Sequence, residues 1–425
     1  MNEQLLQHIW LNKYLLQHNL QTVSGEKIEI LNPGTLNTNQ GPDFFNAKIK
    51  IGNTLWVGNI EIHVKSSSWF EHNHHIDEAY NNVILHVVYV NNKTALNTQN
   101  QTIETLELRS YLSQQLLDKY EILIQKQGKI PCENIIQLPE SIKLAAWLNR
   151  LAIERLERKS KDVFNLLERS NNNWEETFYK MLSKYFGQSV NSEPFLQLAE
   201  ILPVNILSKH KSNLLQLQSL FLGCAGFINQ KQSDIYFIQL QKEFNHLKNK
   251  FSLKTLNASI WKFARTRPAN FPTVRLLQMA LLVYRSNNLF SKICEANTIN
   301  DMFKLLSVTD NQTFLFSQLV PNSISNKTVS LNTGQSFTES LIINAVVPVV
   351  FSFGLYKNNE ILKEKACNWL EQIMPEKNAV IKLYNGFGIV AKNASDSQAL
   401  IELKNNYCNN KKCLSCVIGN RILFN

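Results

Sequence analysis

Four polar residues near the start of the chain have types and spacing that suit metal-dependent chemistry. Asp43 begins an expected strand, and Glu61, His63 and Lys65 alternate along another. Because successive side chains of a strand point to opposite faces, these last three share one face. Carboxylates on two neighbouring strands can bind a hard cation such as Mg²⁺ or Mn²⁺, and a basic residue beside them can stabilise a phosphoryl transition state. The pattern therefore predicts a phosphodiesterase site.

The same residues resemble the motif of the PD-(D/E)XK nuclease superfamily, which reads Pro-Asp, a spacer, then an acid, any residue and Lys. Pro42-Asp43 matches the first part, and Glu61 follows 18 positions after Asp43. The resemblance implies a restriction-endonuclease-like core that cleaves nucleic acid, with Asp43 and Glu61 as metal ligands. His63 stands at the expected Lys position, and Lys65 lies two residues later. Either His63 replaces the lysine, or Lys65 reaches into the site, or the core has decayed into a non-catalytic nucleic-acid-binding or scaffold protein. A further alternative is a plain hairpin with Asp43 in a turn and Glu61 in a surface ion pair.

Histidines are concentrated in the same region. Five of the nine are His63, His72, His74, His75 and His86. The three middle ones fall in an expected loop and can bind Zn²⁺ or iron together with Asp77. This loop predicts an alternative activity, a zinc-dependent hydrolase. His86 lies within an apolar strand and is interpreted as a core residue.

The elements that must position these residues divide the chain in two. Residues 3–17 have helical spacing, and strand-like runs follow at Lys27–Leu31, Ala47–Ile51, Leu55–Val64, Asn82–Val90 and Ile103–Leu108. From about Ser141 the pattern is helical, and Gln125–Pro139, with its glycine and prolines, is the expected boundary. The fold class predicted is α+β. Residues 1–135 form a small α/β restriction-endonuclease-like domain, and residues 136–425 form a larger, mostly helical domain with a C-terminal Cys-rich turn.

Positive charge is concentrated in the second part. The whole chain has a net charge of +10, whereas residues 1–135 hold 10 basic and 13 acidic residues. A segment at 261–275 interleaves arginines with aromatic residues, which suits binding to a nucleic-acid backbone. The residues predicted to bind nucleic acid are Lys262, Arg265, Arg267 and Arg275. The alternative is a rigid turn between helices, because two prolines stiffen the segment.

Three cysteines close to the C-terminus form a second candidate metal site. Cys408, Cys413 and Cys416 have the spacing of a zinc knuckle and are flanked by lysines. Cys367 or Cys132 can supply the fourth ligand through the fold. An iron–sulfur cluster or three free thiols are the alternatives.

Composition restricts the class of protein. With 425 residues, 44% of them hydrophobic and 18% charged, the chain is too apolar for a disordered protein. No apolar run is long enough for a membrane span, and the N-terminus lacks the pattern of a signal peptide. Seven cysteines, mostly far apart, favour a reducing compartment. We therefore expect a cytoplasmic protein with no membrane partner.

At the level of the whole chain, the sequence is similar to a family of bacterial proteins of unknown function. The segments that carry this similarity are GPDF, GNIEIHVKSSSW, AYNNVILHVV, NNNWEETFY, FLGCAGF, WKFARTRPANFPTVR and YCNNKKCLSCVIGNRIL. The similarity implies one architecture over nearly the full chain and adds no activity.

Overall fold

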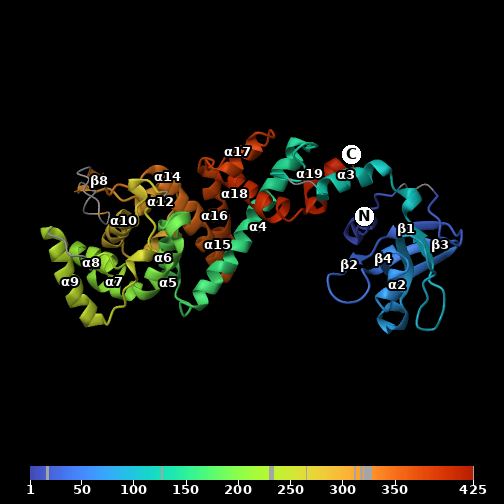
Figure 1. The fold of residues 1–425 in the computed structure, drawn as a ribbon, viewed down its shortest axis with the longest axis horizontal. Coiled ribbons are helices and arrows are strands. Elements are labelled where there is room, and N and C mark those ends of the chain that lie inside the picture. Colours follow the sequence, from blue (N-terminus) through green and yellow to red (C-terminus); the bar gives the residue numbers. More distant parts are fainter. Residues whose placement is uncertain are drawn as a thin grey trace. The chain divides into compact units, whose positions relative to one another are not determined.

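The computed structural model describes residues 1–15, 19–125, 128–228, 234–264, 266–310, 313–315, 319 and 328–424. The chain forms two compact units: Met1–Trp147 with Leu403–Asn425, and Leu148–Glu402. The first unit contains a mixed sheet and the second is mainly helical (Figure 1). The prediction of an α+β fold is therefore confirmed.

The first unit opens with helix α1 (Glu3–Leu11), which is capped by Asn2 and packs its buried apolar face against the sheet. The strands are β1 (Ile28–Asn32), β2 (Thr35–Leu36), β3 (Phe44–Ile51), β4 (Thr54–Lys65), β5 (Val83–Val90) and β6 (Thr105–Glu107). The other helical elements are α2 (Ser68–Glu71), η1 (His74–Ile76), η2 (Glu78–Tyr80), η3 (Arg109–Tyr111), α3 (Gln114–Gln125), η7 (Leu403–Cys408), η8 (Cys413–Ser415) and α19 (Val417–Phe424).

The sheet has the order β1-β3-β4-β5-β6, with β2 paired to β3. Strands β1, β3 and β4 are antiparallel, whereas β4, β5 and β6 are parallel. A two-residue turn joins β3 to β4, and its Gly52 has a φ of +57°, which hairpin turns of this length favour. The crossover from β4 to the parallel β5 carries α2, η1 and η2. Four of the five clustered histidines therefore lie on β4 or in this crossover.

The second unit is built from helices. They are α4 (Ser141–Glu168, which begins in the first unit), α5 (Trp174–Phe186), α6 (Gln188–Ile201), α7 (Val204–His210), α8 (Leu214–Cys224), α9 (Ile235–Phe251), η4 (Ala258–Ile260), η5 (Pro268–Asn270), α10 (Pro272–Arg285), α11 (Leu289–Glu295), α12 (Ile299–Leu306), α14 (Gln335–Leu341), η6 (Ile342–Val346), α15 (Val347–Tyr356), α16 (Glu360–Gln372), α17 (Ala379–Asn385) and α18 (Ala394–Glu402). A small antiparallel pair, β7 (Thr313–Leu315) and β8 (Thr328–Ser330), accompanies them.

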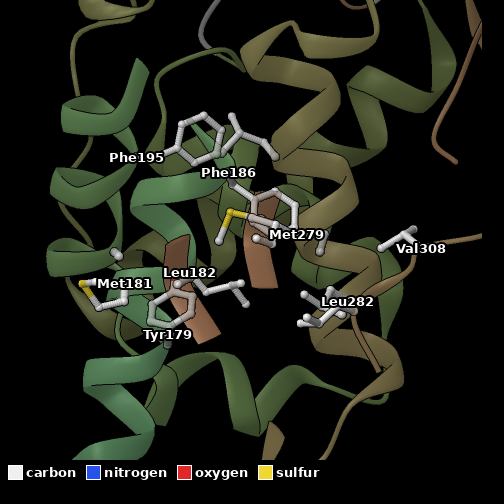
Figure 2. Close-up of a cluster of buried hydrophobic side chains, with 14 of the residues drawn as sticks. Tyr179, Met181, Leu182, Phe186, Phe195, Met279, Leu282 and Val308 are labelled. Atoms are coloured by element: carbon white, nitrogen blue, oxygen red, sulfur yellow. The ribbon is translucent and has the colours of Figure 1, made fainter. Parts of the chain in front are cut away.

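A continuous apolar core holds these helices together. Figure 2 shows part of it, where Phe186 of α5, Phe195 of α6 and Met279 of α10 meet. Burial of such side chains is worth about 1.5–3 kcal/mol each, so the core is the main source of stability in this unit.

The segment Gln335–Tyr356 is apolar and long enough to cross a membrane by length and composition. It comprises α14, the π-helical η6 and α15, and 72% of its most apolar window is buried inside the structure. Such burial is what the central helix of a folded core shows, so its apolar character is explained by packing.

Candidate metal centre

Glu61 lies at the centre of a dense polar cluster in the first unit. It is a buried residue of β4, and its register partner on the parallel strand β5 is His86. Asp43 immediately precedes β3, which pairs with β4 on its other side. The order of the strands therefore brings Asp43 and His86 to the two sides of Glu61.

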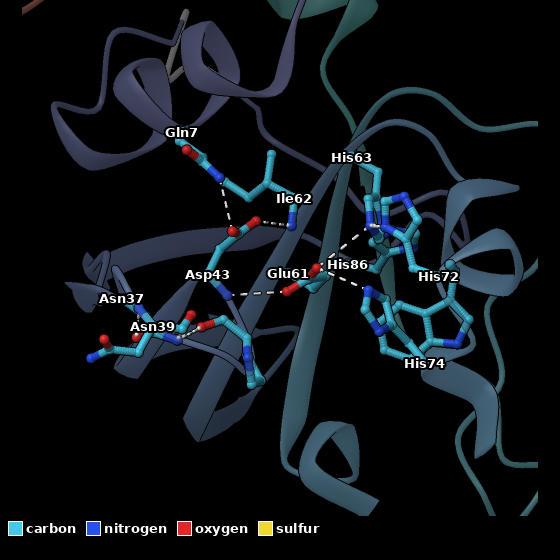
Figure 3. Close-up of polar contacts among 12 residues, drawn as sticks. Gln7, Asn37, Asn39, Asp43, Glu61, Ile62, His63, His72, His74 and His86 are labelled. Atoms are coloured by element: carbon cyan, nitrogen blue, oxygen red, sulfur yellow. Dashed lines mark hydrogen bonds and ion pairs between the residues drawn. The ribbon is translucent and has the colours of Figure 1, made fainter. Parts of the chain in front are cut away.

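The two carboxylates are linked through the backbone. The Asp43 N–H donates to Glu61 Oε2 at 3.0 Å, and the Ile62 N–H donates to Asp43 Oδ2 at 2.9 Å. Gln7 Nε2 of α1 donates to the other oxygen of Asp43 at 2.8 Å. Figure 3 shows the Asp43 carboxylate turned toward Gln7 and Ile62, while Glu61 extends toward the histidines. Glu61 Oε1 is therefore the carboxylate oxygen that faces the imidazole rings.

Two imidazoles face this oxygen, and a third lies beside them. Glu61 Oε1 lies 3.2 Å from His74 Nε2 and 3.5 Å from His63 Nε2. His63 Nε2 is also 3.1 Å from His72 Nδ1. In the described part of the chain, His63, His72 and His74 form the one group of metal-binding side chains whose ligand atoms all lie within 4.8 Å of one another.

These separations match those of a compact metal site. Bonds of 2.0–2.2 Å in a tetrahedral zinc site place neighbouring ligand atoms about 3.3–3.6 Å apart. The three distances between ligand atoms given above, 3.1, 3.2 and 3.5 Å, lie close to this range. The three imidazoles can therefore hold one cation together, and Glu61 Oε1, which faces His74 and His63, can complete the set if the side chains move.

The crossover from β4 to β5 positions the two loop histidines. Trp69 of α2 is buried and donates its indole N–H to a backbone carbonyl, which fixes the start of the loop. Asn73 has a φ of 62°, a left-handed conformation that asparagine tolerates, and it turns the chain between His72 and His74. The ring of Tyr80 stacks on His74 with centroids 3.7 Å apart. His74 is buried as a result, whereas His72 remains exposed.

The cluster has an excess of buried negative charge. Burial is the main cause that raises the pKa of both Asp43 and Glu61, and the negative charge of Glu3 adds to both shifts. Within the described residues, the ion pairs of Glu61 are with histidines alone. A bound cation would compensate this charge and keep the carboxylates ionised.

Two of the histidines are held in the neutral form. Burial, with a smaller contribution from nearby histidines, lowers the pKa of His63 to about 2 and that of His86 to about 3. His63 Nδ1 lies 2.9 Å from His86 Nε2. With His63 Nε2 directed at a metal, its Nδ1 carries the proton and donates to His86, which fixes the orientation of the ring.

His86 and Gln7 are contacts of the site that the sequence pattern does not reveal. His86 is fully buried, as expected for a core residue, yet it is also the hydrogen-bond partner of His63. The only feature of the sequence that could have indicated this role of His86 is its place in an apolar strand next to a strand with a polar face. Gln7 lies far from the motif in sequence, on an amphipathic helix, and nothing in the pattern marks it.

Other residues of the predicted site lie outside this group. Lys65 is exposed at the end of β4. The ring of His75 faces Phe70, with centroids 5.0 Å apart, and Asp77 caps η2 by accepting a backbone N–H. The structure thus brings a histidine of β4 together with two loop histidines, whereas the contacts of His75 and Asp77 are within the loop.

The basic segment of the second unit is divided between surface and core. Lys262 and Arg267 are exposed, and Arg265 lies outside the described residues. Trp261 is buried, and its indole N–H donates to the carbonyl of Ala225 at 2.8 Å. The buried Trp261 is therefore occupied by the core and does not offer a stacking surface for bases.

Arg275 does not have the position that the predicted nucleic-acid contact requires. It is only 4% exposed, and its guanidinium lies 3.2 Å from the centroid of the Phe337 ring. It donates to Gln278 and Asn270 from within α10. Contact with a phosphate would require opening the helix packing, so Arg275 is a structural residue.

The tail cysteines belong to the first unit. Cys408 ends η7, Cys413 opens η8, and Cys416 precedes α19. Cys132 is buried in the same unit, whereas Cys367 lies on α16 of the second. Of the two expected fourth ligands, only Cys132 is thus in the same unit as the tail.

Comparison with known proteins gives one match. The model of a family described as "Protein of unknown function (DUF2851)" matches residues 3–379. Neither the curated proteins nor the solved structures gave a match. Because the matched range covers nearly the whole chain, including the entire β-sheet and its histidines, the protein belongs to the DUF2851 family.

Proposed function

We propose that the protein is a metal-dependent phosphodiesterase that acts on nucleic acid, with the metal bound by Glu61, His63, His72 and His74. The observation that carries this proposal is the cluster of three imidazoles at Glu61: His63 Nε2 lies 3.1 Å from His72 Nδ1, and Glu61 Oε1 lies 3.2 Å from His74 Nε2 and 3.5 Å from His63 Nε2. A carboxylate and imidazoles this close together have the donor set of a transition-metal site.

The donor set decides the choice of metal. Mg²⁺ takes oxygen ligands and dehydrates reluctantly, whereas imidazole suits Zn²⁺ and iron, and a mixed set also accepts Mn²⁺. We therefore favour Zn²⁺ or Mn²⁺ over Mg²⁺. In this proposal Asp43 is a positioning residue that holds Glu61 through its backbone N–H.

The chemistry requires an activated water and access for the substrate. A metal in this centre would lower the pKa of a bound water toward neutrality. His72 is exposed, so the centre can be reached from solvent on its side. Lys65 lies on the same face of β4 as Glu61 and His63, where its ammonium group would attract a phosphate.

The fold and the charge distribution support nucleic acid as the substrate. A helix followed by antiparallel strands that carry an acid at Asp43 and another at Glu61 is the arrangement that the nuclease resemblance implies. The second unit has an open groove of about 1360 Å³, whose charged lining residues are Arg267, Lys377 and Lys382 together with Glu339 and Glu376, so that the cations outnumber the carboxylates. Such a basic groove would bind a phosphate backbone in a salt-dependent manner.

A cleavage assay tests the proposal. The full-length protein is incubated with single- and double-stranded DNA and RNA, with Zn²⁺, Mn²⁺ or Mg²⁺. We expect cleavage with Mn²⁺ or Zn²⁺, its loss in Glu61→Gln, and its retention in Glu71→Gln, an exposed carboxylate on the same crossover. Absence of cleavage with every substrate and metal would refute the enzymatic proposal.

One observation favours a second function, a nucleic-acid-binding or scaffold protein with a structural metal. Four protein ligands are typical of closed structural zinc sites, whereas catalytic sites usually keep three ligands and a water. In this case the same assay gives nucleic-acid binding and full metal occupancy with no cleavage. The two functions are therefore separated by one set of measurements.

We also propose a reducing, cytoplasmic location. None of the seven cysteines forms a disulfide in the structure. Thiols persist in this form where glutathione and thioredoxin keep them reduced. Localisation of the tagged protein by cell fractionation tests this proposal.

A further inference from the structure

The C-terminal tail folds back onto the segment that contains Cys132. Gly128, Lys129 and Pro131 line an open cavity of about 570 Å³ together with Lys404, Cys408 and Lys411. Lys411 Nζ also donates to the carbonyl of Ile124 at the end of α3. The fold thus brings together two segments that are more than 250 positions apart in the sequence.

The four thiols in this region influence one another electrostatically. Burial raises the pKa of the Cys132 thiol to about 12, and Cys408, Cys416 and Cys413 each contribute to the shift. Burial likewise raises the pKa of Cys413 to about 12, with contributions from Cys416 and Cys408. The geometry agrees with this, because Pro131, the neighbour of Cys132 in the chain, lines the same cavity as Cys408.

The turn around Cys416 is shaped to stabilise a thiolate. The backbone N–H groups of Gly419 and Ile418 donate to its sulfur, which lowers the pKa against the larger effect of burial. A Cβ at Gly419 would lie 2.1 Å from the carbonyl oxygen of Cys413, so only glycine allows the chain to approach so closely. N–H donors directed at a sulfur favour its ionised, metal-binding form.

We propose that Cys132, Cys408, Cys413 and Cys416 bind one Zn²⁺ in a structural site that fastens the C-terminal tail to the first unit. The site is distinct from the histidine centre and does not depend on the proposed function. Among the described residues, these sulfurs are not gathered within 4.8 Å as the histidines are, so metal binding would draw them together.

The surroundings compensate the charge of such a centre. Zinc with four thiolates carries a net charge of about −2. Lys129, Lys404 and Lys411 line the adjoining cavity, and residues 403–425 contain no Asp or Glu. The positive charge of the tail therefore favours thiolates over neutral thiols at this position.

Elemental analysis and X-ray absorption of the full-length protein test the proposal. We expect about one equivalent of zinc bound to sulfur at about 2.3 Å in the wild type. Cys132→Ser and Cys416→Ser should each lose this sulfur-bound zinc. Cys367→Ser is the matched control, because that thiol is in the second unit, and it should retain the zinc. Retention of sulfur-bound zinc in Cys132→Ser would overturn the assignment of the fourth ligand.

Two further measurements use proteins that keep all four thiols. Titration of the wild type with a mercurial reagent should release zinc as the four thiols react, and reaction without zinc release would overturn the proposal. His72→Ala should keep the sulfur-bound zinc, which separates this site from the histidine centre. Stoichiometric iron and acid-labile sulfide in anaerobically purified protein would show that the cysteines bind an iron–sulfur cluster and not zinc, and this result would refute the proposal.

Discussion

At the scale of single residues, the candidate centre depends on which atoms of Glu61 are already engaged. One oxygen accepts the Asp43 N–H and the other faces His74 and His63. The buried atoms His74 Nε2 and His86 Nδ1 lack a hydrogen-bond partner in the described structure. A buried nitrogen without a hydrogen bond lowers the stability of the fold, and a metal bound to His74 Nε2 would satisfy that atom.

The first prediction concerns the loop histidines. His72→Ala should reduce the affinity of the centre for Mn²⁺ by at least roughly 10–100-fold, because it removes one of the converging nitrogens. His75→Ala should leave the affinity unchanged, since that ring faces Phe70 instead. Electron paramagnetic resonance titration with Mn²⁺ measures both, and thiolates compete poorly for this ion. Equal affinities for the two variants would contradict the assignment of the ligands.

The second prediction concerns Asp43. Asp43→Asn keeps the shape and the backbone N–H that holds Glu61, but it removes a negative charge beside the centre. Because that charge helps to attract the cation, we expect metal affinity and cleavage to fall by roughly 10–100-fold, while nucleic-acid binding stays equal or becomes tighter. Asp118→Asn, an exposed change on α3, is the control. A variant that cleaves normally would remove Asp43 from the active site.

At the scale of elements, strand pairing and helix packing decide which polar groups are buried. Pairing of β4 with β3 and β5 surrounds Glu61, whereas packing of α4 buries Lys159, whose Nζ donates to Asn344 at 2.9 Å. Burial is the main cause that lowers the pKa of Lys159 to about 7, and the charge of Arg155 contributes. Glu376 and Asp162 act in the opposite direction.

This shift predicts the pH dependence of stability. The unfolded chain holds the Lys159 proton up to its ordinary pKa of 10.5, whereas the folded chain releases it near 7. The contribution of Lys159 therefore makes the free energy of unfolding rise with pH between about 7 and 10.5. Below pH 7 the folded chain carries the buried charge, and the destabilisation that this charge causes is complete.

Lys159→Met should accordingly stabilise the protein at pH 6, by an amount on the order of a few kcal/mol, and the gain should shrink toward pH 10. Urea unfolding at the two pH values measures this difference. Lys161→Met, a neighbouring exposed lysine, should show no such pH dependence. A gain for Lys159→Met that is the same at both pH values would contradict the explanation.

At the scale of the whole molecule, the chain combines a sheet unit with a helical unit of different charge. Residues 1–135 have a net charge of −3 and the rest of the chain one of +13, of which the tail at 403–425, part of the sheet unit, contributes +4. Exposed cations of the helical unit, such as Arg267 and Lys382, line its groove, while Arg275 is used in its core. The groove is therefore the part of this unit that we expect to bind a polyanion.

Salt-dependent binding tests this role of the groove. Arg267→Ala should weaken nucleic-acid binding for all sequences alike and reduce the slope of log affinity against log salt by about 1. Lys292→Ala, an exposed cation outside the lining of the groove, should leave the slope unchanged. Binding that does not depend on salt in the wild type would exclude the groove as a phosphate-binding surface.

The sequence by itself determined the α+β class and the residue types of the candidate centre. Alternation with a period of two places Glu61 and His63 on one face of a strand wherever that strand pairs, so their proximity follows from local geometry. The change to helical spacing after about Ser141 reflects a local periodicity too.

Only the tertiary structure decided which distant groups meet. His72 and His74 join His63 because the buried Trp69 and the turn at Asn73 fix the crossover, and none of these contacts follows from spacing. The buried position of Arg275 and the approach of the tail to Cys132 depend on packing between segments far apart in the chain. Local patterns specify faces and periods, whereas the pairing of remote surfaces is set by the free energy of burying them together, and that is a property of the whole fold.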